Sequence, residues 1–94
     1  MIRTLANTDT ESIWNGEQIR RFSLDVQRQG RRRMRMLDAA DTLDELRSLP
    51  GNRYHVLTKD RAGQHSISIN LQYRICFVWK DGDAYDVEVV DYHD

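Results

Sequence analysis

The residues in this sequence that could transfer protons at neutral pH are its histidines, His55, His65 and His93. Imidazole titrates closer to neutral pH than any other unperturbed side chain, so each is a candidate general acid or base. His65 alternates with Ile67 and Ile69 along an extended segment, which favours packing in the core over chemistry for this residue. A lone histidine in a strand is usually a structural residue, and this alternative applies to His55 as well.

Asp91, Tyr92 and His93 form a second group with chemical potential near the end of the sequence. On an extended chain, residues two positions apart share a face, so Asp91 and His93 are expected on one face and Tyr92 on the other. Asp91 could therefore act as a base or orient His93. The histidine spacing fits no zinc-binding pattern, and the single cysteine, Cys76, is expected to be a small buried side chain. We expect no metal ion and no other cofactor.

Helical signals occupy the first half of the chain. After a short strand at residues 2–5, a helix is expected to start at Asn7 or Thr8 and to stop at Asn15-Gly16. Ser23 should cap a longer helix that reaches about residue 41, and further turns follow over residues 42–49. One apolar stripe on the long helix consists of Val26, Gly30, Met34 and Leu37. Four arginines fall off this stripe and are expected to face water or a ligand: Arg28, Arg31, Arg32 and Arg35.

From Pro50 onward the hydrophobic pattern changes from helical to alternating. The expected strands cover residues 53–57, 65–71, 73–79 and 84–92. Asp81-Gly82 is a strong signal for a two-residue hairpin between the last two strands. The sequence therefore predicts one domain, residues 1–94, of the α+β class. In it, an N-terminal strand and two helices pack on an antiparallel sheet of about four to five strands.

Composition and charge place limits on the class of protein. The chain has 39% hydrophobic and 31% charged residues, no apolar run long enough to cross a bilayer and no secretory signal, so a cytoplasmic location is expected. The net charge of −1 hides a segregation, because residues 20–35 are rich in arginine and residues 81–94 are acidic. Such asymmetry points to a polyanionic partner on one face or to an acidic protein partner, without choosing between them.

Several short motifs, taken in order, carry a resemblance to a known family. They are Leu37-Asp38-Ala39-Ala40, Pro50-Gly51-Asn52-Arg53, residues 55–63 (HVLTKDRAG), residues 65–69 (HSISI), residues 73–77 (YRICF), residues 81–87 (DGDAYDV) and the final Asp91-Tyr92-His93. In this order and spacing they resemble the HigB-type toxins of the RelE/ParE superfamily, the plasmid maintenance killer proteins of type II toxin–antitoxin systems. The likeness covers nearly the whole chain and is densest from Pro50 onward.

The resemblance implies a RelE-like fold and a ribosome-dependent endonuclease that cleaves mRNA in the A site. It also implies a HigA-type helix-turn-helix antitoxin, with operator DNA contacted only through the antitoxin complex. The family's catalytic positions correspond to His55, Asp91, Tyr92 and His93. A family lysine aligns with Thr58, and Lys59 follows one residue later. A one-residue slip in a strand would turn that side chain to the other face, although at a loop edge Lys59 could still reach the site.

Cleavage of RNA by its own 2′-hydroxyl needs a base, an acid for the leaving 5′-oxygen and cations against the phosphate charge. His55 and His93 are the natural acid and base, and Tyr92 could stack on a base or hydrogen-bond the phosphate. The candidate cations are Lys59 and Arg74, with Arg53 and Arg61 as weaker ones. The candidates for docking to 16S rRNA are Arg28, Arg31, Arg32 and Arg35, because arginine contacts to phosphate give sequence-independent affinity.

Two other functions remain open at this point. A ParE-like chain would bind a protein such as gyrase without nuclease chemistry, and His55 with the Asp91-Tyr92-His93 ending argues against it. A weakly active or degenerate toxin would serve mainly to bind its antitoxin and operator, and the departure at Thr58 keeps that alternative. RNA cleavage on translating ribosomes separates the nuclease from both.

Overall fold

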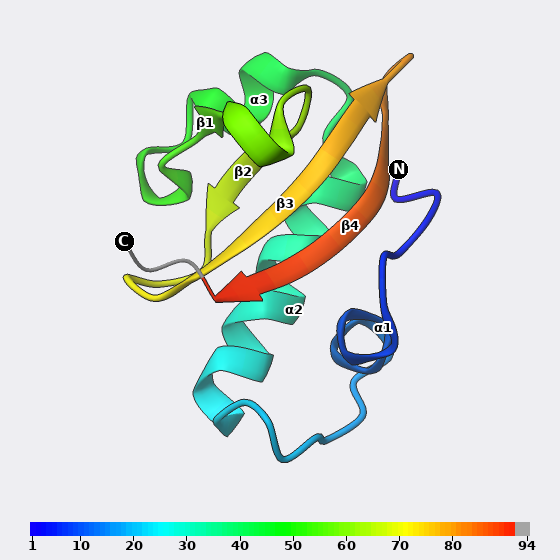
Figure 1. Ribbon diagram of the computed structural model, residues 1–94, viewed down its shortest axis with the longest axis vertical. Helices are drawn as coiled ribbons and strands as arrows, with labels where there is room; N and C mark the ends of the chain where they lie inside the picture. Colours follow the sequence, from blue (N-terminus) through cyan, green and yellow to red (C-terminus); the bar gives the residue numbers. More distant parts are fainter. Residues whose placement is uncertain (92–94) are drawn as a thin grey trace.

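The computed structural model describes residues 1–91, in which helices cover one face of an antiparallel sheet (Figure 1). The helices are α1 (Thr8–Trp14), α2 (Leu24–Ala39) and α3 (Leu43–Arg47), with 3-10 turns η1 (Pro50–Asn52) and η2 (Lys59–Arg61). The strands are β1 (His55–Val56), β2 (His65–Ser68), β3 (Tyr73–Lys80) and β4 (Asp83–Asp91), in the order β1-β2-β3-β4. The predicted α+β class and the four-stranded meander are confirmed.

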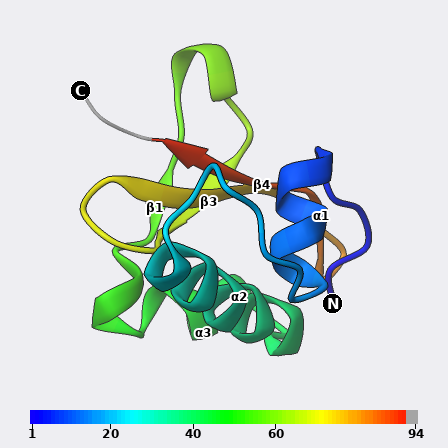
Figure 2. The same cartoon turned by 90° about the horizontal axis from the view of Figure 1, so that it is seen from below.

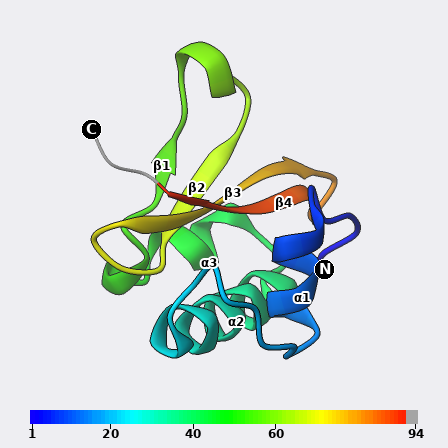
Figure 3. The same ribbon diagram turned by 60° about the horizontal axis from the view of Figure 1, so that its bottom comes forward.

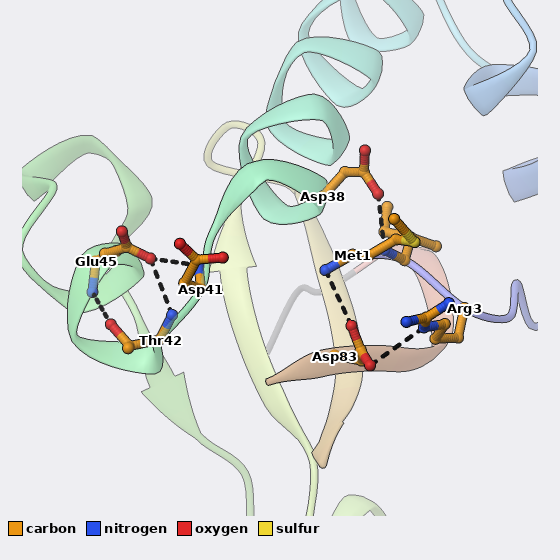
Figure 4. Close-up of polar contacts among 8 residues, drawn as sticks. Met1, Arg3, Asp38, Asp41, Thr42, Glu45 and Asp83 are labelled. Carbon is orange, nitrogen blue, oxygen red and sulfur yellow. Dashed lines mark hydrogen bonds and ion pairs between the residues drawn. The ribbon is translucent and has the colours of Figure 1, made fainter. Parts of the chain in front are cut away.

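Each α-helix starts at a side chain that accepts a hydrogen bond from its first turn. The three caps are Asn7, Ser23 and Thr42. At α3 the cap is a capping box, in which the Glu45 carboxylate accepts the backbone N–H of Thr42 at 2.9 Å and also that of Asp41 (Figure 4). Such a cap satisfies N–H groups that have no partner inside the helix and stabilises it by about 1 kcal/mol. The predicted helix starts are therefore confirmed.

The core lies between α2 and the sheet. The predicted apolar stripe of α2 is buried throughout and packs against fully buried side chains of the strands, among them Ile67, Ile75 and Phe77. Side chains alternate along a strand, so the intervening residues Ser66 and Cys76 lie on the opposite face. Figures 2 and 3 show all three helices on one side of the sheet and the loop between β1 and β2 rising from the other.

Residues 1–6 run beside β4 and pair with it at only two points, Ile2 with Ala84 and Leu5 with Val87. The predicted first strand is thus reduced to two parallel bridges. Between them β4 is bulged, because Asp86 adopts a left-handed conformation (φ 52°) and the register with β3 shifts there.

The start of the chain is also held by side chains, as Figure 4 shows. The backbone N–H of Ile2 donates to the Asp38 carboxylate of α2 at 2.8 Å, and Arg3 forms an ion pair with Asp83 at 3.1 Å. Although desolvation opposes ionisation, the hydrogen bond from Arg3 holds the pKa of Asp83 below its ordinary value. These contacts join the first residues to α2 and to β4.

Two strands are shorter than the sequence predicts. Of the strand expected over residues 53–57, only His55–Val56 is extended and paired. Arg53 before it has a left-handed φ of 44°, and η2 begins at Lys59 soon after Val56. The strand expected to reach Leu71 ends at Ser68, because the Asn70 side chain accepts the backbone N–H groups of Gln72 and Tyr73 and closes a turn. Leu71 is 86% exposed in that turn, where the alternation predicted a buried position.

The predicted hairpin between β3 and β4 is confirmed. Asp81 and Gly82 both have positive φ, 52° and 82°, as a two-residue turn between twisted strands requires. No helix within residues 1–91 is long and apolar enough to cross a membrane.

Candidate active site

The sheet face opposite the helices carries an open groove of about 700 Å³. The strand register places His55 opposite Ser66 and Ser66 opposite Cys76, so these residues of β1, β2 and β3 share this face. The predicted site residues that line the groove are Arg53, His55, Lys59, Arg61 and Arg74. The fold therefore brings together side chains from β1, from the loop after it and from β3.

Arg74 lies on the floor of the groove, where it is half-buried. Its Nε donates to the Ser66 Oγ at 2.9 Å, and a terminal nitrogen donates to the backbone carbonyl of Arg53. Because the guanidinium is planar, two such bonds define both its position and the orientation of its plane. Arg74 thus links β3 to the segment before β1, across β2.

The groove has an excess of positive charge. Arg53 and Lys59 are exposed, and neither has an ion pair with any of residues 1–91. Arg61 is held by the Glu88 carboxylate of β4 at 3.2 Å, so part of its charge is compensated. Asp60 is the acidic residue among the described side chains that line the groove. This balance favours a phosphate or another anion.

Lys59 lies at the start of η2 with a left-handed φ of 58°. Thr58 and Lys59 both line the groove and both are exposed. Lys59 is not part of a regular strand, so the one-residue offset from Thr58 does not turn it to the other face of the sheet. Its location agrees with the expectation for a loop edge, while its catalytic role stays a prediction.

His55 is exposed on the edge strand β1, and the residue before it, Tyr54, is half-buried. The hydroxyl of Tyr54 forms a hydrogen bond with His65 Nδ1, the two rings stack at 5.7 Å, and Arg47 lies 5.1 Å from the centre of the Tyr54 ring. Burial, helped by the charge of Arg47, lowers the pKa of His65. His65 also stacks on Phe77, which confirms its predicted packing role.

Asp91 lies elsewhere, at the end of β4. It pairs with Tyr73, whose ring packs on Phe22 on the helix side, and it lines a second depression of about 390 Å³ together with Asp9. The Gln72 amide donates to its carboxylate at 3.2 Å. The strand register thus gives Asp91 the face of Tyr73, opposite the face of His55 and Arg74. Tyr92 and His93 lie outside the described residues, and their predicted roles stay predictions.

Comparison with known protein families identifies the family of this chain. The family of HigB-like toxins, described as the RelE-like toxin of the type II toxin–antitoxin system HigB, matches residues 11–93. This chain belongs to the HigB-like toxin family.

Two relatives agree with this assignment, and one solved structure shares the fold. Toxin HigB-1 of Vibrio cholerae is 45% identical over 53 residues, which cover 56% of each chain. Endoribonuclease HigB of Proteus vulgaris is 41% identical over 59 residues, 61% of this chain and 64% of that one. The matches therefore span less than two thirds of either relative. The YoeB–YefM complex from Staphylococcus aureus shares the fold, with a TM-score of 0.59, 11% identity and coverage of 100% and 99% of the two chains.

In this HigB-like toxin the helix arginines lie on the far side of the sheet from the groove. Arg28, Arg32 and Arg35 are exposed on the outer side of α2. Arg31 differs from the prediction, because it is half-buried, donates to the Trp14 carbonyl at 3.3 Å and lies within 3.0 Å of the position a Cβ would take at Gly16. Arg31 thus packs α2 against the end of α1 and does not simply face water.

Cys76 is buried, as predicted, and the strand register places it on the groove side of the sheet. Burial raises the pKa of its thiol, even though Arg61 lies near enough to oppose the shift. No three His, Cys, Asp or Glu side chains within residues 1–91 are grouped so that they could hold a metal ion.

Sequence reasoning missed Ser66 as a part of this site. The alternation along residues 65–71 already put Ser66 on the non-apolar face, but a serine in a strand carries no chemical signal of its own. Only the contact with Arg74 shows what its hydroxyl does. Sequence reasoning also missed the contact of Tyr54 with His65, which lies outside the groove, since the two residues are eleven positions apart and meet only through strand pairing.

Proposed function

We propose that this HigB-like toxin is an endoribonuclease that cleaves mRNA in the A site of the ribosome and so inhibits translation. The observation that supports it best is the groove, where His55 is exposed among the cations Lys59, Arg53 and Arg74. A proton-transfer group beside cations is what cleavage of a phosphodiester requires. The name of the Proteus vulgaris relative, Endoribonuclease HigB, agrees with this activity.

In the proposed reaction a base takes the proton of a 2′-hydroxyl, and that oxygen attacks the adjacent phosphorus. The bond from phosphorus to the 5′-oxygen of the next nucleotide breaks, and an acid protonates the departing oxygen. The products are a 2′,3′-cyclic phosphate and a 5′-hydroxyl. His55 is proposed to carry one of the two proton transfers. Arg74 and Lys59 would stabilise the additional negative charge of the phosphorane, and loss of one such contact typically costs about 10²–10³-fold in rate.

The second proton transfer is assigned to His93, with Asp91 and Tyr92 as its neighbours in the sequence. This assignment comes from the family resemblance. Asp91 lines the other depression, so of its two expected roles we propose that it orients His93 and does not act as a base on the RNA.

The outer face of α2 is proposed to dock on 16S rRNA through Arg28, Arg32 and Arg35, the exposed members of the predicted set. The groove opens on the other side of the sheet, so rRNA bound to α2 would leave the groove accessible to mRNA. We further propose that a HigA-type helix-turn-helix antitoxin binds this toxin in the cytoplasm, and that operator DNA is contacted only through their complex.

The deciding experiment adds the purified toxin to ribosomes programmed with a defined mRNA and maps new 5′ ends. Cuts within the A-site codon that disappear in His55→Ala, in His93→Ala and without ribosomes would support the proposal. Cuts that persist in a folded His55→Ala variant would remove His55 from the chemistry. A folded wild-type toxin that makes no cuts would favour a module that only binds its antitoxin, or a gyrase-type inhibitor.

A further inference from the structure

We propose that Ser66 is a positioning residue, which holds the Arg74 guanidinium on the groove floor and couples it to the strand that carries His55. The activity readouts of this proposal rest on the proposed RNA cleavage. Its structural readout does not.

Ser66 occupies the centre of the site without being accessible to a substrate. It is fully buried in β2, directly opposite His55 of β1 on one side, and its Oγ accepts the Nε–H of Arg74 from β3 on the other, at 2.9 Å. A residue directly across an antiparallel pair lies about 5 Å away at Cβ, and a diagonal one about 7–8 Å away. Ser66 is therefore the side chain that stands between the proposed proton-transfer group and the proposed phosphate ligand.

The second hydrogen bond of Arg74 extends the coupling to β1. It runs to the backbone carbonyl of Arg53, two residues before His55, where the chain has a left-handed φ of 44°. A long arginine side chain can otherwise adopt many rotamers, so the hydrogen bond that Arg74 donates to Ser66 restricts the guanidinium to one position. Displacement of a reacting group by about 1 Å can cost 10²-fold in rate, which makes such restraint significant for catalysis.

Ser68 provides a matched contrast on the same strand and the same face. It is also buried, but its Oγ donates to the Asn70 carbonyl at 2.8 Å and closes the turn after β2. Replacing either serine by alanine removes one buried hydroxyl from β2. Ser68 lies directly across from Arg74 in the strand register, but it is the Ser66 hydroxyl that accepts the Nε–H of Arg74, so the Ser66 change removes this acceptor and the Ser68 change does not.

The structural test follows the Arg74 Nε–H in the free full-length toxin by NMR hydrogen exchange. Ser66→Ala should accelerate exchange of this hydrogen about tenfold or more, because its acceptor is lost. Ser66→Thr, which keeps the hydroxyl, and Ser68→Ala should both stay within about threefold of the wild type. Equal exchange in Ser66→Ala and the wild type would overturn the proposal, whatever the toxin does to RNA.

The activity test measures single-turnover cleavage on programmed ribosomes. Ser66→Ala should lower the maximal rate by roughly 10- to 100-fold with little change in the half-saturating ribosome concentration, and Ser66→Thr should retain most of the rate. If Ser66 acts through Arg74, Ser66→Ala should cost little more in an Arg74→Lys background. Multiplicative losses in the double variant, or an equal loss in Ser68→Ala, would overturn it. Absence of cleavage by the wild type would instead refute the proposed function, and the exchange experiment would still decide the role of Ser66.

Discussion

Neutralising Lys59 should weaken binding of single-stranded RNA to the groove and flatten its salt dependence. Lys59 is an exposed cation that lines the groove, whereas Arg28, Arg32 and Arg35 lie on the opposite side of the sheet. The change Lys59→Gln therefore removes a phosphate contact at the site, and neutralisation of the three helix arginines does not. The two kinds of variant should separate binding in the groove from docking on the ribosome.

The expected change in salt dependence follows from the number of cations in the groove that a bound RNA strand would contact. Arg61 is already paired with Glu88, whereas Arg53 and Lys59 are exposed and have no ion pair within residues 1–91, so these two are counted as the main phosphate contacts. Each contact adds about 0.7 to the steepness of the slope of log K against log salt for a single strand, so the wild-type slope should be about −1.4 and that of Lys59→Gln about −0.7. An exposed ion pair contributes up to about 1 kcal/mol, so the affinity should fall by at most roughly fivefold.

Fluorescence anisotropy with a short RNA measures both the affinity and its slope against salt. The RNA carries 2′-O-methyl groups, so it cannot be cleaved by its own 2′-hydroxyl during the measurement. Lys80→Gln is the matched control, since Lys80 is an exposed lysine at the hairpin end of β3. The triple variant Arg28→Gln, Arg32→Gln, Arg35→Gln should bind the short RNA as the wild type does and bind ribosomes less tightly. A slope that Lys59→Gln leaves unchanged, or that the helix variant lowers as much, would show that RNA does not bind in the groove.

Three further predictions concern stability. The pKa of His65 is lowered in the folded state, so the unfolded chain takes up its proton first as the pH falls below 6.5, and the toxin should lose stability between about pH 7.5 and about pH 5.5. Urea unfolding at the two pH values should show this loss, and His65→Gln should reduce it. Thr42→Ala breaks the capping box of α3 and should cost about 1 kcal/mol in urea unfolding, whereas equal stability would mean that α3 is held by packing alone. Gly30→Ala should raise the thermal midpoint by a few degrees, because a Cβ there would meet Ile69 Cδ1 at an ordinary 3.4 Å and alanine favours the helix by up to about 1 kcal/mol. A lower midpoint would show that this contact is already too tight.

The parts of the fold that the sequence predicted well are those that depend on neighbours along the chain. Ser23 and Thr42 cap helices through bonds to backbone groups three residues away, and Asp81-Gly82 turns the chain within two residues. The parts predicted less well depend on distant contacts. Arg31 was expected to face water or a ligand, and its observed partner, the Trp14 carbonyl, is seventeen residues away. Leu71 was expected to be buried in a strand. It is exposed, because the turn that the Asn70 side chain closes ends the strand before Leu71.

The sequence by itself determined the α+β class, the order of elements, the family resemblance and the identity of the groups that could transfer protons or neutralise phosphate. These follow from hydrophobic period, local turn chemistry and residue type. Tertiary structure alone decided which of them meet. Strand register puts His55, Ser66 and Arg74 on one face and gives Asp91 the other, and the layer of helices places the α2 arginines behind the sheet. Register and layering are decided by the burial of the whole core, which no local stretch of sequence contains.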